Sequence, residues 1–318
     1  MHESLIALDP VRINFSESGN FALNLALAFI MFGVALNIRI NSFKTLIHAP
    51  KPLFIGLFLQ FILLPVITFI LVIVLNKVIT PAVAMGMILV AACPGGNISN
   101  FMTSLSKGNT ELSVTMTAIS TVLAIFMTPF NFSLWGGLYV NLLNRMAGNM
   151  LQPLEIEYAQ MFETVILIIG IPVILGVSFS RYFPKASLTL KKILQFLSIL
   201  FFFALVAVMF SNNWELFVKH IKYIFLIVFI HNAALLLSGY TTATLFKQPD
   251  RNRRAITIET GIQNSGLGLV LLLNPDIFPP ETAIGGMLFI TAWWGIWHII
   301  SGLGLSFYWA RKPLTVEN

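Results

Sequence analysis

Charged side chains are scarce in this sequence. Only 10% of its 318 residues are Asp, Glu, Lys or Arg, against about 25% in a typical soluble domain, so a water-soluble globule could not cover its surface. Hydrophobic residues make up 57% of the chain and 28 residues are Phe, which excludes an intrinsically disordered chain. The single cysteine, Cys93, excludes a disulfide framework and a cysteine-rich metal site. Together these absences indicate an integral membrane protein.

The basic residues indicate orientation in a membrane rather than nucleic-acid binding, although the formal net charge is +6. They lie in short clusters between long apolar runs, and alternate clusters can be assigned to opposite sides. One side receives Arg12, Lys77, Arg145, Lys219 and Lys222, and the other side receives the remaining 14 of the 19 Lys and Arg residues. By the positive-inside rule the larger set is cytoplasmic. We therefore expect a protein of the cell (inner) membrane with its N-terminus outside and its C-terminus in the cytoplasm.

About nine apolar runs are long enough to cross a bilayer as helices. They cover residues 21–38, 53–75, 82–106, 111–130, 159–180, 193–211, 221–246, 255–273 and 283–309. The runs lack the alternation that is typical of membrane β-strands. The predicted fold class is therefore an all-α polytopic membrane protein with the lipid bilayer as its surroundings. Residues 1–20 lack a basic start and an apolar core, so we expect a polar leader rather than a cleaved signal peptide.

Two of these runs are interrupted by residues that break helices. The third contains the sequence CPGGNISN at residues 93–100, and the eighth contains ETGIQNSG at residues 259–266. Proline removes a backbone donor and glycine adds flexibility, and a broken helix survives in a membrane only inside the protein or beside an aqueous cavity. The third run is the third of the first four, and the eighth run is the fourth of the last five. The two breaks therefore occupy equivalent positions if the chain derives from two halves of five helices and the first half lacks its first helix. Paired breaks in an inverted repeat are typical of the binding site of a transporter.

Oxygen-bearing side chains gather around these breaks. Glu259 is the one acidic residue predicted deep in the membrane, where a carboxylate marks function. The other donors are Gln60, Ser99, Asn100, Ser113, Thr117 and Gln263. Oxygen ligands suit a hard cation, so Na⁺ is the first candidate and H⁺ on Glu259 the alternative. The N-termini of half-helices would favour an anionic substrate.

The motifs CPGGNISN, ELSVTMTAIST and ETGIQNSG resemble, in this order, the signatures of the bile acid:sodium symporter family, which includes bacterial relatives of the bile acid carriers. The resemblance implies a panel domain and a core domain in which two unwound helices cross. The panel would comprise residues 21–38 and 159–211, and the core residues 53–130 and 221–309. The leader, residues 1–20, and a cytoplasmic tail, residues 310–318, lie outside both domains. The chain would lack the first helix, like the animal members.

The resemblance also implies two sodium sites. The first would use Ser99, Asn100, Ser113, Thr117 and Glu259, and the second Gln60, Glu259 and Gln263 with the backbone carbonyls of Thr260 and Ile262. Asn264 resembles the substrate-facing asparagine of the family. Asn97 is also expected at the substrate, although bile-acid-binding members commonly carry Thr there. His298 is a further candidate for substrate contact, with an interfacial aromatic belt as the alternative.

The function that we predict is sodium-coupled symport of an organic anion by alternating access, with no enzymatic activity and no nucleic-acid partner. The substrate would be bile acid-like or a small carboxylate such as a 2-keto acid or pantoate. A proton-coupled carrier is the nearest alternative, and a channel or sensor of the same fold is another. A membrane enzyme is disfavoured because HExxH and paired intramembrane Asp residues are absent from the sequence. A metalloid-efflux relative is disfavoured by the two break motifs. Oligomeric state and stoichiometry stay open.

Overall fold

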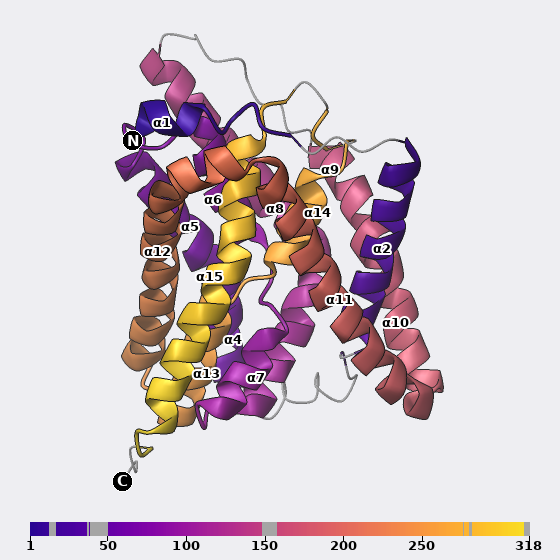
Figure 1. Ribbon diagram of the computed structural model, residues 1–318. Helices are drawn as coiled ribbons and strands as arrows, with labels where there is room; N and C mark the ends of the chain where they lie inside the picture. The colour runs from indigo at the N-terminus through magenta and orange to yellow at the C-terminus, as the bar shows by residue number, and fades with distance from the viewer. Residues whose placement is uncertain are drawn as a thin grey trace.

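The predicted all-α class is confirmed by the computed structural model, which describes residues 1–12, 17–36, 38, 50–147, 158–275, 277–279 and 282–314. Within these residues the chain is helical apart from turns, short extended segments and one isolated bridge between Gly95 and Gln263. Met1 and the end of the last helix lie at opposite ends of the molecule (Figure 1). This placement agrees with an odd number of membrane crossings. Parts of the predicted leader (13–16), first span (37) and tail (315–318) lie outside the described residues.

The described residues form helices along most of the chain. In chain order they are α1 (His2–Ile6), α2 (Glu17–Ala35), α4 (Pro50–Phe58), η2 (Leu59–Leu63), α5 (Leu64–Val74), α6 (Pro81–Ala92), α7 (Ile98–Leu105), α8 (Thr110–Ala147), α9 (Tyr158–Val165), η3 (Ile166–Gly170), α10 (Ile171–Tyr182), α11 (Pro184–Asn212), α12 (Trp214–Leu245), α13 (Asp250–Gly261), α14 (Ser265–Leu272) and α15 (Gly285–Ala310).

Six helical stretches among the described residues are long and apolar enough to cross a membrane. They are Pro50–Val74, Thr110–Met146, Phe162–Tyr182, Pro184–Asn212, Trp214–Leu245 and Gly285–Ala310, and α6 is a shorter apolar helix. The multi-pass membrane assignment therefore stands, whereas the predicted count of nine is not established. Helix α8 also extends beyond the predicted run 111–130, because it continues through Pro129 instead of ending there.

Two long helices contain a wider, π-helical turn just before a proline. Segment η2 precedes Pro65 and segment η3 precedes Pro172. Proline cannot donate a backbone hydrogen bond, and its ring crowds the preceding turn. A π-helical turn absorbs this mismatch without ending the helix. The apolar runs 53–75 and 159–180 therefore stay continuous, and η2 carries Gln60 on the widened turn.

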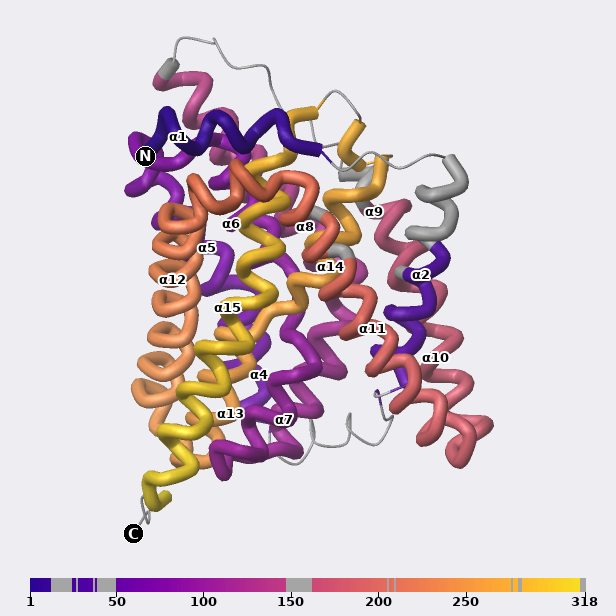
Figure 2. The backbone as a smooth tube through the Cα atoms, viewed as in Figure 1, coloured from indigo at the N-terminus to yellow at the C-terminus, as the bar shows by residue number. Residues whose placement is uncertain are grey.

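Helices α2, α10 and α11 pack together along one side of the molecule (Figures 1 and 2). Their contacts are close: a Cβ atom on Gly176 of α10 would lie 2.7 Å from the carbonyl oxygen of Phe32, and one on Gly33 would lie 2.7 Å from the Cβ of Leu194. Only glycine permits such approaches between helices in a membrane. We refer to these three helices as the side group.

The N-terminal segment lies across one end of the bundle (Figure 1). The backbone N–H of Gly285 donates to the carbonyl of Asp9 over 3.0 Å, and the hydroxyl of Thr80 donates to the Asp9 carboxylate over 3.0 Å. Arg12 donates to the carbonyls of Pro279 and Thr282. Burial raises the pKa of Asp9 to about 6, although the hydrogen bond from Thr80 opposes the shift. This segment ties the starts of α6 and α15 together.

Candidate functional site

The two predicted breaks are present and pair with each other. Residues 93–97 separate α6 from α7, and residues 262–264 separate α13 from α14. The backbone N–H of Gly96 donates to the carbonyl of Ile262, and that of Asn264 donates to the carbonyl of Pro94, each over 2.8 Å. These bonds satisfy polar backbone that the helices leave free, which membrane burial requires. We call this pair of bonded breaks the crossing.

Glu259 lies at the crossing, on the last turns of α13, and is 2% exposed. Its carboxylate accepts three hydroxyl hydrogen bonds, from Ser99 (2.5 Å), Ser113 (3.0 Å) and Thr117 (2.6 Å). The Oδ1 of Asn100 lies 2.9 Å from the Ser113 hydroxyl and 3.2 Å from the Thr117 hydroxyl, so Asn100 and Glu259 share the single hydrogen of each hydroxyl. All five residues assigned to the first sodium site are thus brought together from α7, α8 and α13.

No basic side chain pairs with Glu259 within the described residues. The ion pairs found there join Asp250 to Arg253 and to Arg254, near the start of α13. A buried carboxylate without a cationic partner is costly, and hydroxyl donors lower this cost only in part. The arrangement therefore has the charge and the hard oxygen ligands that suit a small cation or a proton.

Gly95 gives the Glu259 side chain room beside the backbone. A Cβ atom at Gly95 would lie 2.4 Å from Oε1 of Glu259. Since real Cβ atoms do not approach an oxygen so closely, any other residue would displace either the carboxylate or the break. Glycine therefore suits this position for two reasons: its backbone is flexible, and it has no side chain to collide with the Glu259 carboxylate.

Gln60 and Gln263 form a second polar cluster at the crossing. The Nε2 of Gln60 donates to Oε1 of Gln263 over 2.9 Å and to the carbonyl of Cys93 over 2.7 Å. The Nε2 of Gln263 donates to the carbonyl of Thr260 over 2.8 Å, while the Ile262 carbonyl accepts from Gly96 as described above. These contacts bring four of the five residues assigned to the second sodium site together. The carboxylate of the fifth, Glu259, accepts its hydrogen bonds from Ser99, Ser113 and Thr117 of the first cluster.

Side chains from unbroken helices donate hydrogen bonds to backbone carbonyls of the irregular segments. Thr128 donates to the carbonyl of Ala92 at the end of α6 (2.8 Å), and Asn131 donates to that of Phe61 in η2 (3.1 Å). Asn232 donates to the carbonyl of Gly261 at the end of α13 (2.8 Å) and accepts from Ser301. These residues hold the backbone around the crossing in place.

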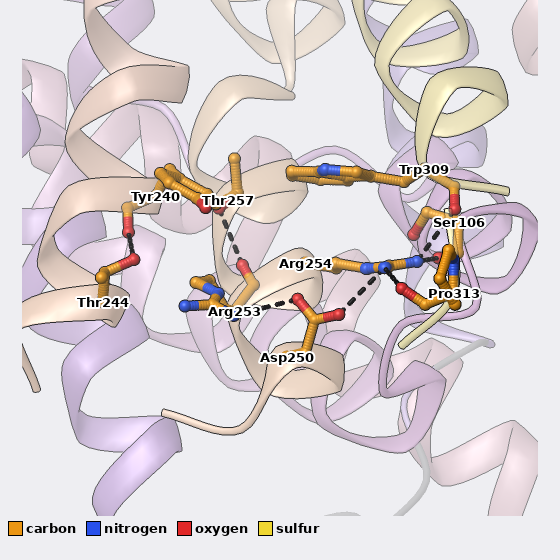
Figure 3. Close-up of polar contacts among 9 residues, drawn as sticks. All are labelled: Ser106, Tyr240, Thr244, Asp250, Arg253, Arg254, Thr257, Trp309 and Pro313. Carbon is orange, nitrogen blue, oxygen red and sulfur yellow. Dashed lines mark hydrogen bonds and ion pairs between the residues drawn. The ribbon is translucent and has the colours of Figure 1, made fainter. Parts of the chain in front are cut away.

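Arg254 anchors the far end of α13 (Figure 3). It is 2% exposed, and its guanidinium donates to the carboxylate of Asp250 and to the carbonyls of Ser106, Trp309 and Pro313. The Trp309 ring lies over the guanidinium, 5.9 Å from its Cζ to the ring centroid. These bonds join the start of α13 to the ends of α7 and α15.

A cavity of about 560 Å³ lies between the crossing and the side group. All three residues predicted at the substrate, Asn97, Asn264 and His298, line it, together with Gln263. Helices α7 and α14 both begin at this cavity, and the Oδ1 of Asn264 accepts from the backbone N–H of Leu267 at the start of α14. The volume falls in the range of small-molecule sites, about 300–1,000 Å³.

Sequence reasoning missed several residues of this region. Thr103, whose hydroxyl donates to Ser113, and the supporting Thr128 and Asn131 were not singled out. Each is a buried polar residue in an apolar helix, a pattern that often marks functional or helix-joining positions.

His231, whose Nε2 lies 2.8 Å from the Thr68 hydroxyl, packs among helices and does not line the cavity.

Comparisons with known proteins show which transporters the chain is similar to. A family model described as "Sodium Bile acid symporter family" matches residues 24–220. The chain is 33% identical over 290 residues to the "Uncharacterized sodium-dependent transporter YocS" of Bacillus subtilis, covering 91% of this chain and 83% of that protein. It is 28% identical to the "Probable sodium/metabolite cotransporter BASS2, chloroplastic" of Oryza sativa, covering 97% and 68%. It is 30% identical to the human "Sodium/bile acid cotransporter 4", covering 93% and 67%.

Proposed function

Because the chain belongs to the Sodium Bile acid symporter family, whose members are sodium-dependent transporters, we propose that it imports an organic anion together with two sodium ions. The observation that carries the proposal is the buried Glu259, which is surrounded by oxygen ligands and has no basic partner among the described residues. A cation bound there would neutralise the carboxylate. The hydroxyl groups that now donate to Glu259 would turn their oxygens toward the ion.

The first ion would bind Ser99, Asn100, Ser113, Thr117 and Glu259. The second would bind beside it, through Gln60, Glu259 and Gln263 with the carbonyls of Thr260 and Ile262. Two Na⁺ and one carboxylate leave a charge of +1, which a monovalent organic anion cancels. Net neutrality of the loaded site lowers the cost of charge inside the membrane.

The anion would bind in the cavity beside Asn97, Asn264 and His298. Helices α7 and α14 both start at the cavity, so the positive ends of their dipoles would favour an anion there. A bile acid-like acid or a small carboxylate such as a 2-keto acid or pantoate would meet the same donors. In this proposal the carboxylate lies toward the crossing, and the remainder of the molecule extends toward the side group.

We assign the side group to a panel domain and the helices that surround the crossing to a core domain. The panel comprises residues 21–38 and 159–211, and the core residues 53–130 and 221–309. Rocking of one against the other would expose the cavity to alternate sides of the cell membrane, with the N-terminus outside and the C-terminus in the cytoplasm. The cavity between the two groups supports this assignment.

Proton coupling is the second candidate, because the same three hydroxyl groups could hold Glu259 in its protonated form. The hydrogen bonds from Ser99, Ser113 and Thr117 then rearrange, since a protonated carboxyl must itself donate one bond. Anion uptake driven by a pH gradient in the absence of Na⁺ would support this alternative.

The decisive experiment is the change Glu259→Gln, which keeps the size of the side chain and removes its charge. We expect the purified variant to fold and to lose the rise in melting temperature that NaCl produces over choline chloride in the wild type, since ion binding stabilises the folded state. Glu163→Gln removes an exposed carboxylate from α9 and serves as the control. A wild-type response to Na⁺ in Glu259→Gln would refute the proposal.

A further inference from the structure

Two polar side chains reach the cavity from α11, a helix that takes no part in the crossing. Gln195 and Ser198 both line the cavity, and they are the only polar residues between positions 193 and 210. An uncharged polar side chain within an apolar membrane helix usually forms a hydrogen bond within the protein or contacts a ligand. The proposed sodium and carboxylate sites use neither residue.

The face of α11 that carries Gln195 is held firmly. Positions 195, 198, 199 and 202 lie on one face of a helix, and all four line the cavity. Leu194 packs on Gly33 of α2. Phe202 packs on α15, where a Cβ atom at Gly295 would lie 2.2 Å from the phenyl Cζ. Gln195 therefore projects from a fixed backbone into the cavity.

The two polar side chains differ in their hydrogen bonds. The Ser198 hydroxyl donates to the carbonyl of Leu194 over 2.6 Å, so its hydrogen is used within the helix. Gln195 forms no hydrogen bond with any residue in the described part of the chain, which leaves its amide free for a ligand. Across the cavity, Nδ1 of His298 is buried and likewise has no partner among the described residues.

Between these polar groups the cavity wall is apolar. Ile30 and Val34 of α2 and Ile199 and Phe201 of α11 contribute to it. No Lys, Arg, Asp or Glu belongs to the lining formed by the described residues. A second charged group on the ligand would therefore lose its hydration without a partner, whereas an uncharged hydroxyl or amide would match the Gln195 amide.

Building on the proposed function, we propose that Gln195 determines substrate specificity by hydrogen bonding a second, uncharged polar group of the transported anion. The carboxylate of that anion lies at the crossing and an apolar body lies along α2 and α11. The preferred substrate is thus an acid with a distant hydroxyl or amide rather than a plain acid or a diacid.

The test measures binding of straight-chain acids from hexanoate to decanoate and of their ω-hydroxy derivatives to the purified protein. Titration calorimetry in NaCl and in choline chloride gives the affinities. We expect one chain length at which the hydroxy acid binds about three- to tenfold more tightly than its parent, the effect of one net hydrogen bond. Gln195→Leu should abolish this preference and retain sodium-dependent binding of the parent acid.

Two further variants sharpen the test. Gln195→Asn shortens the side chain by one methylene and should move the preferred hydroxy acid to a longer chain. Ser198→Ala, one turn away, should keep the wild-type preference because its hydroxyl is bonded within the helix. Two results would contradict the role of Gln195 and leave the proposed function intact. One is sodium-dependent binding in which no hydroxy acid binds more tightly than its parent acid, and the other is a preference for the hydroxy acid that persists in Gln195→Leu. Failure of every acid to bind in a sodium-dependent manner would overturn the role of Gln195 together with the proposed function.

Discussion

At the scale of single residues, the Glu259 cluster combines a buried charge with neutral donors only. Ser113 and Thr117 both contact the carboxylate and Asn100, so each hydroxyl serves two partners within about one helical turn of α8. In such a network the loss of one donor affects the others. The first sodium site that we propose should therefore respond to changes as small as a single hydroxyl group.

Thr117→Val tests this point, because it replaces the hydroxyl by a methyl group of similar size. We expect about a tenfold weaker response to Na⁺, equivalent to roughly 1.4 kcal/mol, near the upper end of the range for one net hydrogen bond. The sodium concentration that half-saturates the thermal shift gives the measurement. Thr115→Val is the matched control, since the Thr115 hydroxyl is buried without a partner among the described residues. Equal sodium affinities for the two variants would contradict the prediction.

At the scale of helices, the irregular segments depend on side chains of their unbroken neighbours. Asn131 is 2% exposed, donates to the carbonyl of Phe61 and accepts from the indole of Trp135. Phe61 lies four residues before Pro65, which has no N–H to offer that carbonyl. Asn131 thus supplies the donor that the proline lacks.

We predict that Asn131→Leu destabilises the folded protein by about 1–3 kcal/mol, the cost of a buried polar group left without a partner. The melting temperature in detergent should fall while the helical circular dichroism signal stays. Ser133→Ala on the same helix removes a hydroxyl that has no partner among the described residues and should leave the melting temperature nearly unchanged. An undiminished melting temperature for Asn131→Leu would show that Phe61 finds another donor.

The sequence predicts the breaks but not how they join. Pro94, Gly95 and Gly96 disrupt a helix locally, so their effect is visible in a window of a few residues. The bonds from Gly96 to Ile262 and from Asn264 to Pro94 link residues far apart in the chain, and no local pattern encodes them. The π-helical turn at Gln60 was also missed, although Pro65 within an apolar run is a signal for it.

Arg254 shows the same division between local and distant contacts. Its pairing with Asp250, four residues earlier on a helix, follows from spacing. Its burial does not, because it depends on the carbonyls of Ser106, Trp309 and Pro313, which come from other parts of the chain. The count of basic residues assigned Arg254 to the cytoplasmic set without saying whether its side chain is buried, and the structure places that side chain inside the end of the bundle, 2% exposed.

At the scale of the whole molecule, the N-terminal segment makes stability depend on pH. The folded-state pKa of Asp9 is about 6, above its ordinary value of 3.8, so the folded protein binds the proton more tightly than the unfolded chain. The contribution of Asp9 to stability is therefore greatest below about pH 4 and is lost as the pH rises through 6.

Asp9→Asn keeps an oxygen that can accept from Thr80 and removes the charge. We expect a higher melting temperature than the wild type at pH 7.5 and nearly the same value at pH 4, with the difference developing between the two. Glu3→Gln, which neutralises an exposed carboxylate of the same segment, should not reproduce this trend. A pH-independent difference between Asp9→Asn and the wild type would show that Asp9 acts through packing alone.

The hydrogen bonds between the two breaks have a further consequence for the proposed transport of sodium together with an organic anion. Six consecutive residues, from Glu259 to Asn264, run from the proposed ion pocket to the cavity, and they are tied by backbone bonds to residues 94–96 of the other break. In the proposed mechanism, these few residues would transmit a displacement from one site to the other. The short connection would then oppose slippage, in which ions cross alone and dissipate their gradient, because a displacement at the proposed ion pocket would also move the residues that face the anion.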